Sequence, residues 1–460
     1  MLTKLRIQNF KAWKDTGEIR LAPITVFFGA NSAGKTSLLQ FLLMLKQTAE
    51  SPDRRRVLHP GDDRSLVELG TFEDLIFEHD PNLKLEFEVA WVLPKTLRFN
   101  DPLKGKSYQG DEINFSANLA SVDDTQVVNW LDYKLRRETG DVAVSVRMAR
   151  RNSKSVEYEL SAEGYDLVRI QGRVWPLPSP TRFYGFPDEV PTRYQNAAFT
   201  NDLALALEQQ LERLTYLGPL RDVPNRIYAW AGDYPEHVGR NGEGTVAALL
   251  AGAKREFSLG YKKKAHPFQE VIARWLKQLG LLDSFKARKL AAGRKQYEIR
   301  VRTKGGSGEV DLPDVGFGIS QVLPVVVECF YVKRNSTVII EQPELHLHPR
   351  VQSELADLFI EAIRTWEKGE PRSIQFIVES HSEHFLQRLQ RRIAEGDVKT
   401  TEVALYFCES DAHGSKLRPL EVNLYGEIVN WPDEFFGDPM QDLSKRMEAA
   451  AQKESEPAKQ

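Results

Sequence analysis

Cysteine and long apolar runs are both scarce in this sequence of 460 residues. Its two cysteines, Cys329 and Cys408, each lie in an apolar stretch, which excludes a disulfide scaffold and is expected in a reducing compartment. No apolar run reaches the roughly 18 residues of a membrane-spanning helix, and the N-terminus is charged where a secretory segment would be apolar. We therefore expect a cytoplasmic protein that has no membrane partner.

Net charge is also nearly absent. The 62 Lys and Arg residues almost balance the 65 Asp and Glu residues, which leaves a charge of −3. Such a balance argues against a protein that coats nucleic acid and against a polybasic membrane binder. The apolar share of 41% and the charged share of 28% are typical of globular proteins and exclude wholesale disorder. The sequence shows neither an internal repeat nor a sustained heptad pattern.

Apolar patterning predicts alternating strands and helices at both ends of the chain. Residues 24–28 form a short, fully apolar run, which is typical of a buried strand. Between 95 and 200 the pattern favours further antiparallel strands, with a proline-rich irregular connection at 176–191. Later strands are predicted at 337–340 and 374–378. Helices are predicted at 201–214, 268–279, 319–331, 350–365 and 382–394.

A phosphate-binding loop is predicted directly after the first buried strand. The sequence reads Gly29, four residues, Gly34, Lys35 and Thr36, and a helical apolar pattern follows. Glycines let the backbone wrap so that its N–H groups point at phosphate oxygens, at the N-terminus of a helix. Lys35 is placed to reach the β- and γ-phosphates of a nucleotide, and the Thr36 hydroxyl to bind Mg²⁺. We expect a nucleoside triphosphate and Mg²⁺ as cofactors, and the resemblance described below implies that the nucleotide is ATP.

Acidic residues and a histidine follow two later buried strands. Glu341 follows the strand at 337–340 directly and is a candidate to bind the metal ion. Glu344 is near enough to reach a γ-phosphate. His381 follows the strand at 374–378. Ligands collect at the carboxyl ends of parallel strands, so these side chains should share one site with the phosphate loop.

A second phosphate-binding helix start is predicted at the glycine-rich turn 315–321, which contains Ser320. One nucleotide cannot easily use two helix N-termini at its γ-phosphate within one subunit. We therefore expect this signature turn (315–321) to serve a nucleotide held by a second copy, in a homodimer or a higher assembly of dimers.

The order of these motifs resembles that of the ABC-type ATPases of the RecF and SMC group. It is more closely similar to the AAA family ATPases related to the overcoming-lysogenization-defect (OLD) proteins. The segments 216–221, 341–349 and 431–436 look like the branch that carries domain of unknown function 3696. The resemblance implies an α/β fold: an ABC-ATPase head with a mainly parallel sheet flanked by helices, an antiparallel β N-terminal lobe and an inserted α+β region.

The resemblance also divides the chain. It implies an N-terminal half of the head at 1–94, an insertion at 95–215 and a C-terminal half of the head at 216–400. A family-specific segment at 401–437 and a disordered tail at 438–460 follow. No Asp-x-Asp pair occurs after residue 381, so we expect no Toprim nuclease domain within this sequence.

Residue roles follow from the resemblance. Glu341 takes the Walker B position at the metal beside Thr36, and His381 contacts the γ-phosphate. Gln342 stands where these ATPases carry a catalytic glutamate; it has no carboxylate, so hydrolysis depends on Glu344 or is slow. The nucleotide-binding residues are expected to be Asn31, Ser32, Ala33, Gly34, Lys35, Thr36 and Ser37, with Gly318, Ser320 and Gln321 acting from the second copy.

Several alternatives remain open from the residues alone. His346, His348, His381 and His384 could form a zinc cluster, and Ser380 could belong to a hydrolase triad, although it lacks a glycine elbow. One of the arginines at 221 and 226 could reach a phosphate. Basic clusters at 54–56, 150–151, 262–264 and 391–392 could meet in a nucleic-acid groove.

Three functions are compatible with these features. The first is an ATPase switch or sensor for a protein effector such as a nuclease encoded nearby, in anti-phage defence of the Septu type. The second is a RecF-like ATPase that binds DNA in repair or recombination. The third, a self-contained nuclease, would need the Toprim domain.

Overall fold

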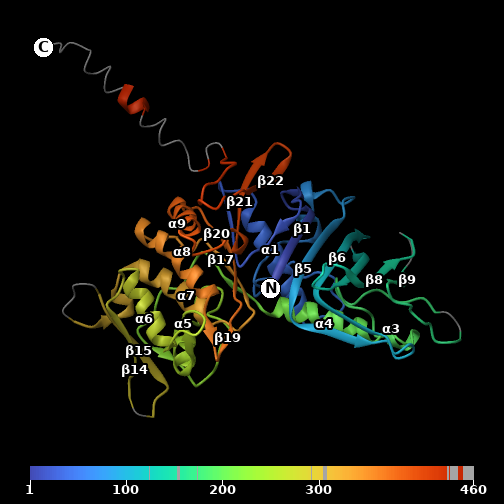
Figure 1. Ribbon diagram of the computed structural model, residues 1–460, viewed down its shortest axis with the longest axis horizontal. Coiled ribbons are helices and arrows are strands. Elements are labelled where there is room, and N and C mark those ends of the chain that lie inside the picture. The colour runs from blue at the N-terminus through green and yellow to red at the C-terminus, as the bar shows by residue number, and fades with distance from the viewer. Residues whose placement is uncertain are drawn as a thin grey trace.

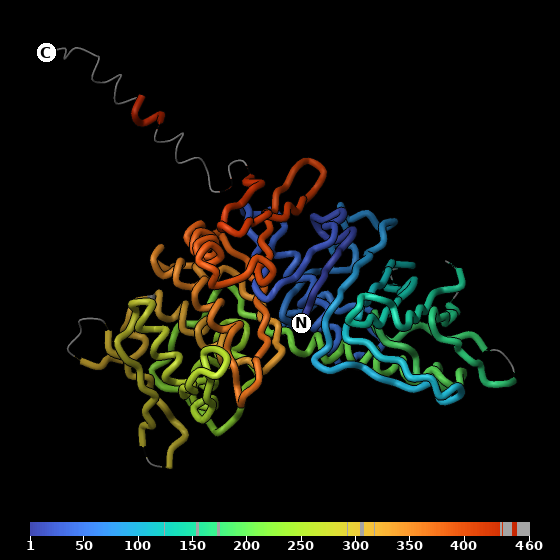
Figure 2. Tube along the Cα trace, viewed as in Figure 1, coloured from blue at the N-terminus to red at the C-terminus, as the bar shows by residue number. Residues whose placement is uncertain are grey.

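Two large sheets form the framework of the protein. The computed structural model describes residues 1–123, 125–152, 156–172, 175–291, 293–303, 308–432, 435 and 444–448. In Figure 1 the antiparallel sheet lies at the right, the mainly parallel sheet near the centre, and helices α5 to α9 at the left. The chain traces of the N-terminal and C-terminal parts meet in the centre (Figure 2), where strands from both pair in one sheet.

The six-stranded sheet carries the phosphate loop. Its order is β10-β17-β20-β4-β21-β22, and all its neighbouring strands run parallel except the β21–β22 pair. β4 comes from the N-terminal part of the chain and lies between two strands from the C-terminal part, so the two parts build one sheet. The strands are β4 (Ile24–Gly29), β10 (Leu214–Leu217), β17 (Thr337–Glu341), β20 (Gln375–Glu379), β21 (Val403–Asp411) and β22 (Gly414–Leu420).

The second sheet has eight antiparallel strands. One of them, β5, runs across the expected boundary between 1–94 and 95–215, so the N-terminal lobe and the first part of the insertion share this sheet. The strands are β1 (Leu2–Phe10), β2 (Trp13–Asp15), β3 (Ile19–Arg20), β5 (Leu85–Asn100), β6 (Ser107–Val122), β7 (Thr125–Arg136), β8 (Val142–Arg150) and β9 (Tyr158–Glu163).

The helices lie close to their predicted ranges. The five helices expected from apolar periodicity are all present, with ends that differ by up to two residues. The longer helices are α1 (Lys35–Glu50), α4 (Phe199–Glu212), α5 (Thr245–Ala251), α6 (Phe268–Gln278), α7 (Phe317–Tyr331), α8 (Pro349–Ile363) and α9 (Glu383–Ala394); α2 (Phe72–Leu75) and α3 (Val190–Arg193) are short.

Two small sheets complete the head. The hairpin of β14 and β15 projects from the body of the molecule at the lower left of Figure 1. The first small sheet contains β11 (Tyr228–Ala229), β14 (Ser284–Lys289), β15 (Gln296–Arg302) and β16 (Val310–Asp311). The second contains β12 (Glu256–Ser258), β13 (Ala265–Pro267), β18 (Trp366–Glu367) and β19 (Glu370–Pro371).

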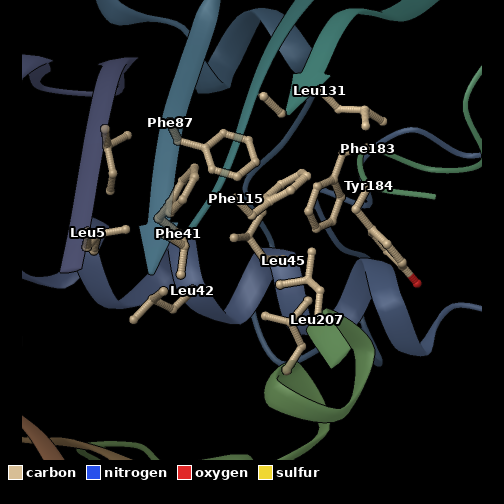
Figure 3. Close-up of a cluster of buried hydrophobic side chains, with 14 of the residues drawn as sticks. Leu5, Phe41, Leu42, Leu45, Phe87, Phe115, Leu131, Phe183, Tyr184 and Leu207 are labelled. Atoms are coloured by element: carbon tan, nitrogen blue, oxygen red, sulfur yellow. The ribbon is translucent and has the colours of Figure 1, made fainter. Parts of the chain in front are cut away.

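Helix α1 is enclosed between the two large sheets. Phe41 packs against Phe87 of the antiparallel sheet, with ring centroids 5.1 Å apart, and Leu207 of α4 belongs to the same cluster (Figure 3). Ile339 and Ile377 of the parallel sheet belong to the same cluster. Interiors packed this closely resist displacement, so the helix holds the phosphate loop that precedes it in a fixed place.

The other face of the parallel sheet forms a second core. Because side chains alternate along a strand, Phe27 faces α1, whereas Val26 and Phe28 join the cluster beneath α7, α8 and α9. The expected α/β class, a mainly parallel sheet flanked by helices beside an antiparallel lobe, is therefore confirmed.

Two sequence expectations concern parts of the chain that are only partly described. No helix among the described residues is long and apolar enough to cross a membrane. The expected tail at 438–460 lies outside the described residues except for 444–448, which are helical.

One buried carboxyl in the second core should make stability depend on pH. Glu328 of α7 is fully buried, and its Oε2 accepts a hydrogen bond of 2.9 Å from the Val238 backbone N–H. Burial raises its pKa from 4.5 to about 7. Between these pH values the unfolded chain loses this proton more readily than the folded chain does, so the free energy of unfolding falls as pH rises.

We expect Glu328→Gln to remove this dependence, because the amide still accepts from Val238 and cannot ionise. Relative to the unsubstituted protein, the variant should gain about 3 kcal/mol of stability between pH 4.5 and pH 7. Urea unfolding at both pH values measures the change, with the exposed Glu256→Gln as control. Equal pH dependence of both proteins would contradict the expectation.

Candidate ATP site

The phosphate loop connects β4 to α1 in a conformation that requires glycine. Gly29 and Gly34 have φ angles of 138° and 86°. A Cβ on Gly29 would lie 2.2 Å from the Cys408 carbonyl oxygen, and one on Gly34 would lie 2.6 Å from the Ser415 hydroxyl. Both the backbone angle and the close approach therefore exclude larger residues, as the motif predicts.

Trp13 contacts the end of the phosphate loop and the first turn of α1. Its indole Nε1–H is shared between the Gly34 carbonyl at 3.1 Å and the Ser37 hydroxyl at 2.9 Å, and the side chain is fully buried. The Ser37 hydroxyl in turn donates to the Gly34 carbonyl at 2.6 Å. Ser37 therefore holds the first turn of α1, while Asn31 and Ser32 are exposed at the tip of the loop and Ala33 is buried.

Lys35 lies inside the loop. Its ammonium donates to the carbonyls of Gly29 at 3.1 Å and Ala30 at 2.6 Å, and the residue is only 3% exposed. Burial lowers the pKa of this lysine, and the nearby carboxylate of Glu379 opposes that shift. A phosphate group would offer the ammonium a partner of full negative charge in place of two carbonyl dipoles.

Glu379 reaches the phosphate loop, a position that sequence reasoning did not assign to it. Its Oε2 accepts a hydrogen bond of 2.8 Å from the Thr36 hydroxyl. The sheet order explains the contact, because β20, and not β17, is the neighbour of β4. The available signal was the position of Glu379 at the end of a buried strand, beside His381.

Glu341, the expected Walker B residue, lies one strand further away. Its Cα pairs with that of Glu379 across β17 and β20, and its Oε1 accepts a hydrogen bond of 2.9 Å from the Tyr216 hydroxyl. Burial, followed by the charge of Glu379, raises the pKa of Glu341 to about 7. Burial likewise raises the pKa of Glu379.

These groups fit a magnesium ion. The Thr36 hydroxyl and the two carboxylates of Glu341 and Glu379 supply oxygen donors, the ligands that Mg²⁺ prefers. Two neighbouring carboxyl groups with raised pKa values repel each other in their charged forms, and a divalent cation would relieve that repulsion. No group of three or more His, Cys, Asp and Glu side chains suited to a metal occurs among the described residues, so the zinc alternative finds no support there.

Glu344 and His381 meet across the turns that follow β17 and β20. The His381 backbone N–H donates to Glu344 Oε1 at 2.6 Å, and His381 Nε2 lies 4.0 Å from Glu379 Oε1. Burial raises the pKa of Glu344, and burial followed by the charge of Lys35 lowers that of His381. The second oxygen of Glu344, Oε2, is buried without a hydrogen-bond partner in the described part of the chain.

A cleft of about 530 Å³ brings the catalytic candidates to the phosphate loop. Its lining residues are Asn31, Gln342, Glu344, Leu345, His346, Gln352, His381 and Ser382.

Ser320 of the signature turn does not line this cleft, although Gly318 of the same turn approaches His346, which does. Ser320 is 6% exposed and lines a separate small cavity with Val223 and Pro224, and Gln321 is buried behind it. Gly318 lies in the first turn of α7, where an added Cβ would sit 3.6 Å from the His346 carbonyl. The structure thus brings Asn31, Glu344 and His381 together and leaves Ser320 outside their cleft.

The two arginines that could have reached a phosphate have other partners. Arg221 is 6% exposed and donates to backbone carbonyls, whereas Arg226 pairs with the aspartates at 311 and 314. Arg240, which sequence reasoning did not single out, is exposed. Its positive charge opposes the rise in the pKa of Glu341 that burial causes.

A glycine-rich phosphate loop, a buried lysine and acidic strand ends that share one edge of a parallel sheet define a nucleotide-hydrolysing ATPase. The chain belongs to the AAA ATPase domain family, whose model matches residues 1–135 and 254–386. A second model, Protein of unknown function (DUF3696), matches residues 398–445. The resemblance inferred from the motifs is thereby confirmed.

Solved structures similar to this chain include SMC head domains. The head domain from Thermotoga maritima is 12% identical with a TM-score of 0.40, and the match covers 92% of this chain and 99% of that one. An SMC head bound to the C-terminal winged-helix domain of ScpA is 14% identical with a TM-score of 0.44, covering 92% and 98%. A Pyrococcus furiosus head with an extended coiled coil is 12% identical, with a TM-score of 0.41 and coverage of 98% and 99%. Among curated proteins, none matches the chain significantly.

We expect Lys35→Ala to abolish ATP binding, because the loop would lose the ammonium that its carbonyls hold. Binding of a fluorescent ATP analogue and release of inorganic phosphate measure the loss. Lys14→Ala, which changes an exposed lysine, is the matched control. Normal turnover by Lys35→Ala would refute the location of the site.

We expect both Glu379→Gln and Glu341→Gln to raise the Mg²⁺ concentration needed for half-maximal ATPase activity, by about tenfold or more. Each removes one charged oxygen donor from the pair beside Thr36. A magnesium titration of ATPase activity measures the shift, and Glu73→Gln, at an exposed carboxyl, should leave it unchanged. A shift in only one variant would assign the metal to that strand alone.

Proposed function

We propose that this ATPase binds ATP between two copies of the chain and acts as a nucleotide-dependent switch for a protein effector. The observation that carries the proposal is the separation of Ser320 from the cleft that holds Asn31, Glu344 and His381. In the proposed dimer, the signature turn of one copy covers the phosphate loop of the other.

Electrostatics supports the shared site. Gly316 precedes α7, a helix of 15 residues, and no side chain of the described residues caps the start of this helix. Helix N-termini carry a partial positive charge and favour phosphate. Two such ends, together with Lys35, would surround the triphosphate only when both copies are present, which makes the dimer depend on nucleotide.

Hydrolysis is proposed to use Glu344. Gln342 lines the cleft and has no carboxylate to accept a proton from water. Glu344 lies in the same cleft, and its raised pKa moves it toward the range in which a carboxylate works as a base near neutral pH. The Mg²⁺ held beside Thr36 would supply charge stabilisation on the phosphate oxygens. A base that is offset from the usual position fits slow turnover, which suits a switch.

An exposed apolar surface supports a protein partner. Leu424, Tyr425, Val429 and Trp431 are 78%, 79%, 69% and 46% exposed, and all four lie in the segment that matches the family of unknown function. Clustered exposed apolar side chains mark sites of protein association. We propose that an effector, such as a nuclease, docks there, and that the pair works in anti-phage defence.

A second candidate is a RecF-like ATPase that binds DNA in repair. The projecting β14–β15 hairpin favours it, because Lys289, Arg294 and Lys295 are exposed near its tip. A two-stranded ribbon fits the major groove of DNA. This candidate requires ATPase activity stimulated by DNA and binding that weakens steeply with salt, neither of which the effector switch requires.

We expect ATP to produce a stable dimer of Glu344→Gln, because the variant binds ATP and cannot activate water. Mass photometry with and without ATP measures the dimer. Ser320→Arg should bind ATP as a monomer, since a large side chain would block the proposed contact.

Mixing provides a sharper test of the shared site. Lys35→Ala and Ser320→Arg are each expected to be inactive, yet their mixed dimer would contain one intact loop facing one intact signature turn. Equal amounts should regain part of the ATPase activity. No recovery on mixing, with both variants folded, would contradict the shared site.

A further inference from the structure

A short segment links the two halves of the proposed site within one subunit. Residues 218–228, called the strap below, leave the end of β10 beside the acidic strand ends and run to β11. The strap lies outside the residues that match the ATPase family model. Its two arginines, Arg221 and Arg226, hold opposite ends of it.

The near end of the strap holds the turn after β17. The Arg221 guanidinium donates to the Glu341 carbonyl at 2.9 Å and to the Gln342 carbonyl at 3.2 Å. Gln342 has a φ of 44°, a left-handed conformation that is unfavourable for a residue with a Cβ. Two hydrogen bonds from one planar guanidinium therefore hold a strained turn, and that turn lines the ATP cleft.

The far end of the strap holds the segment that precedes the signature turn. Arg226 donates to Asp311 at 3.1 Å, and to both carboxylate oxygens of Asp314 at 2.9 Å and 2.5 Å. Asp314 ends a short 3₁₀ turn, Leu312–Asp314, two residues before Gly316. A bidentate pair of this kind fixes direction as well as distance.

Backbone hydrogen bonds also hold the near end of the strap. Gly218 and Asp222 donate backbone N–H groups at 2.8 Å to the carbonyls of Arg240 and Asn241. The supporting loop itself contacts α7, because a Cβ on Gly242 would lie 2.7 Å from Pro324. The strap is therefore fastened at its near end by side-chain and backbone hydrogen bonds and at its far end by the ion pairs of Arg226.

We propose that the strap makes the turn after β17 and the signature turn move together, with Arg221 and Arg226 as positioning residues for the ATPase reaction. The inference rests on the proposed function, since it concerns how a nucleotide in one cleft prepares the same subunit to meet its partner. When the cleft closes on a γ-phosphate, a shift of Gln342 moves Arg221, and Arg226 carries the shift to Asp314 and the start of α7.

The near end is tested with Arg221→Met. We expect its kcat to fall about tenfold while its affinity for an ATP analogue changes less than twofold, because the variant misplaces the turn and leaves the phosphate loop intact. Arg221→Lys, which cannot reach both carbonyls in one plane, should show a partial loss. Gln342→Asn should restore part of the activity of Arg221→Met, because asparagine tolerates the left-handed conformation and keeps the amide.

The far end is tested with Arg226→Gln, which removes an exposed ion pair. We expect the ATP-dependent dimer to weaken about fivefold or more in mass photometry, with the affinity of the monomer for the analogue unchanged. Arg391→Gln, which removes the exposed Arg391–Glu395 pair of α9, is the matched control and should behave like the unsubstituted protein.

The outcomes separate this inference from the proposed function. If the unsubstituted protein neither binds ATP nor dimerises, the proposed function fails and the strap fails with it. If that protein does both and Arg221→Met and Arg226→Gln match it, the strap alone is overturned. Thermal melting identifies a variant that does not fold; if Arg221→Met is one, Arg226→Gln, at an exposed position, decides the matter.

Discussion

The burial of like charges at one sheet edge is the constraint on which the site depends. Glu341 and Glu379 lie opposite each other on neighbouring strands, and Lys35 lies within reach of the second. Buried carboxyl groups are costly unless they are paired or neutralised. The two carboxyl groups therefore favour binding of a cation, and the buried ammonium of Lys35 favours binding of a phosphate. The fold keeps these groups in place because parallel strands deliver their carboxyl ends to the same edge.

Helix α1 transmits that constraint to the rest of the molecule. Its first turn carries Lys35 and Thr36, and its apolar faces are packed between the parallel sheet and the antiparallel lobe. A change in the position of the phosphate loop would therefore disturb the core that the two large sheets share around α1. None of the expected site residues lies on a strand of the antiparallel sheet. The lobe therefore contributes to the site by holding α1 in place.

Local signals in the sequence were sufficient for the phosphate loop and for most helices. Gly29 and Gly34 could be interpreted from the sequence because the backbone angle and the close approach at these positions demand glycine. The hydrogen bond from Thr36 to Glu379 was missed because it depends on which strand lies beside β4. The order of strands in a sheet cannot be predicted from local residue patterns. The boundary expected at residue 94 falls within β5 for a related reason, since residue alternation continues through it.

The partners of Arg221 show why a charged residue near a motif is hard to interpret from sequence. An arginine beside a predicted ATP site suggests contact with phosphate, yet this one binds two backbone carbonyls and stabilises a left-handed glutamine. The energetic reason is burial: a guanidinium that is 6% exposed needs fixed acceptors at all times, whereas a phosphate is present only part of the time. The segment from β10 to α5 therefore stabilises the turn beside the site. The phosphate loop and the acidic strand ends lie in the residues that match the ATPase family model. A substitution in that segment would therefore alter the support of the turn after β17 without changing any residue of the phosphate loop.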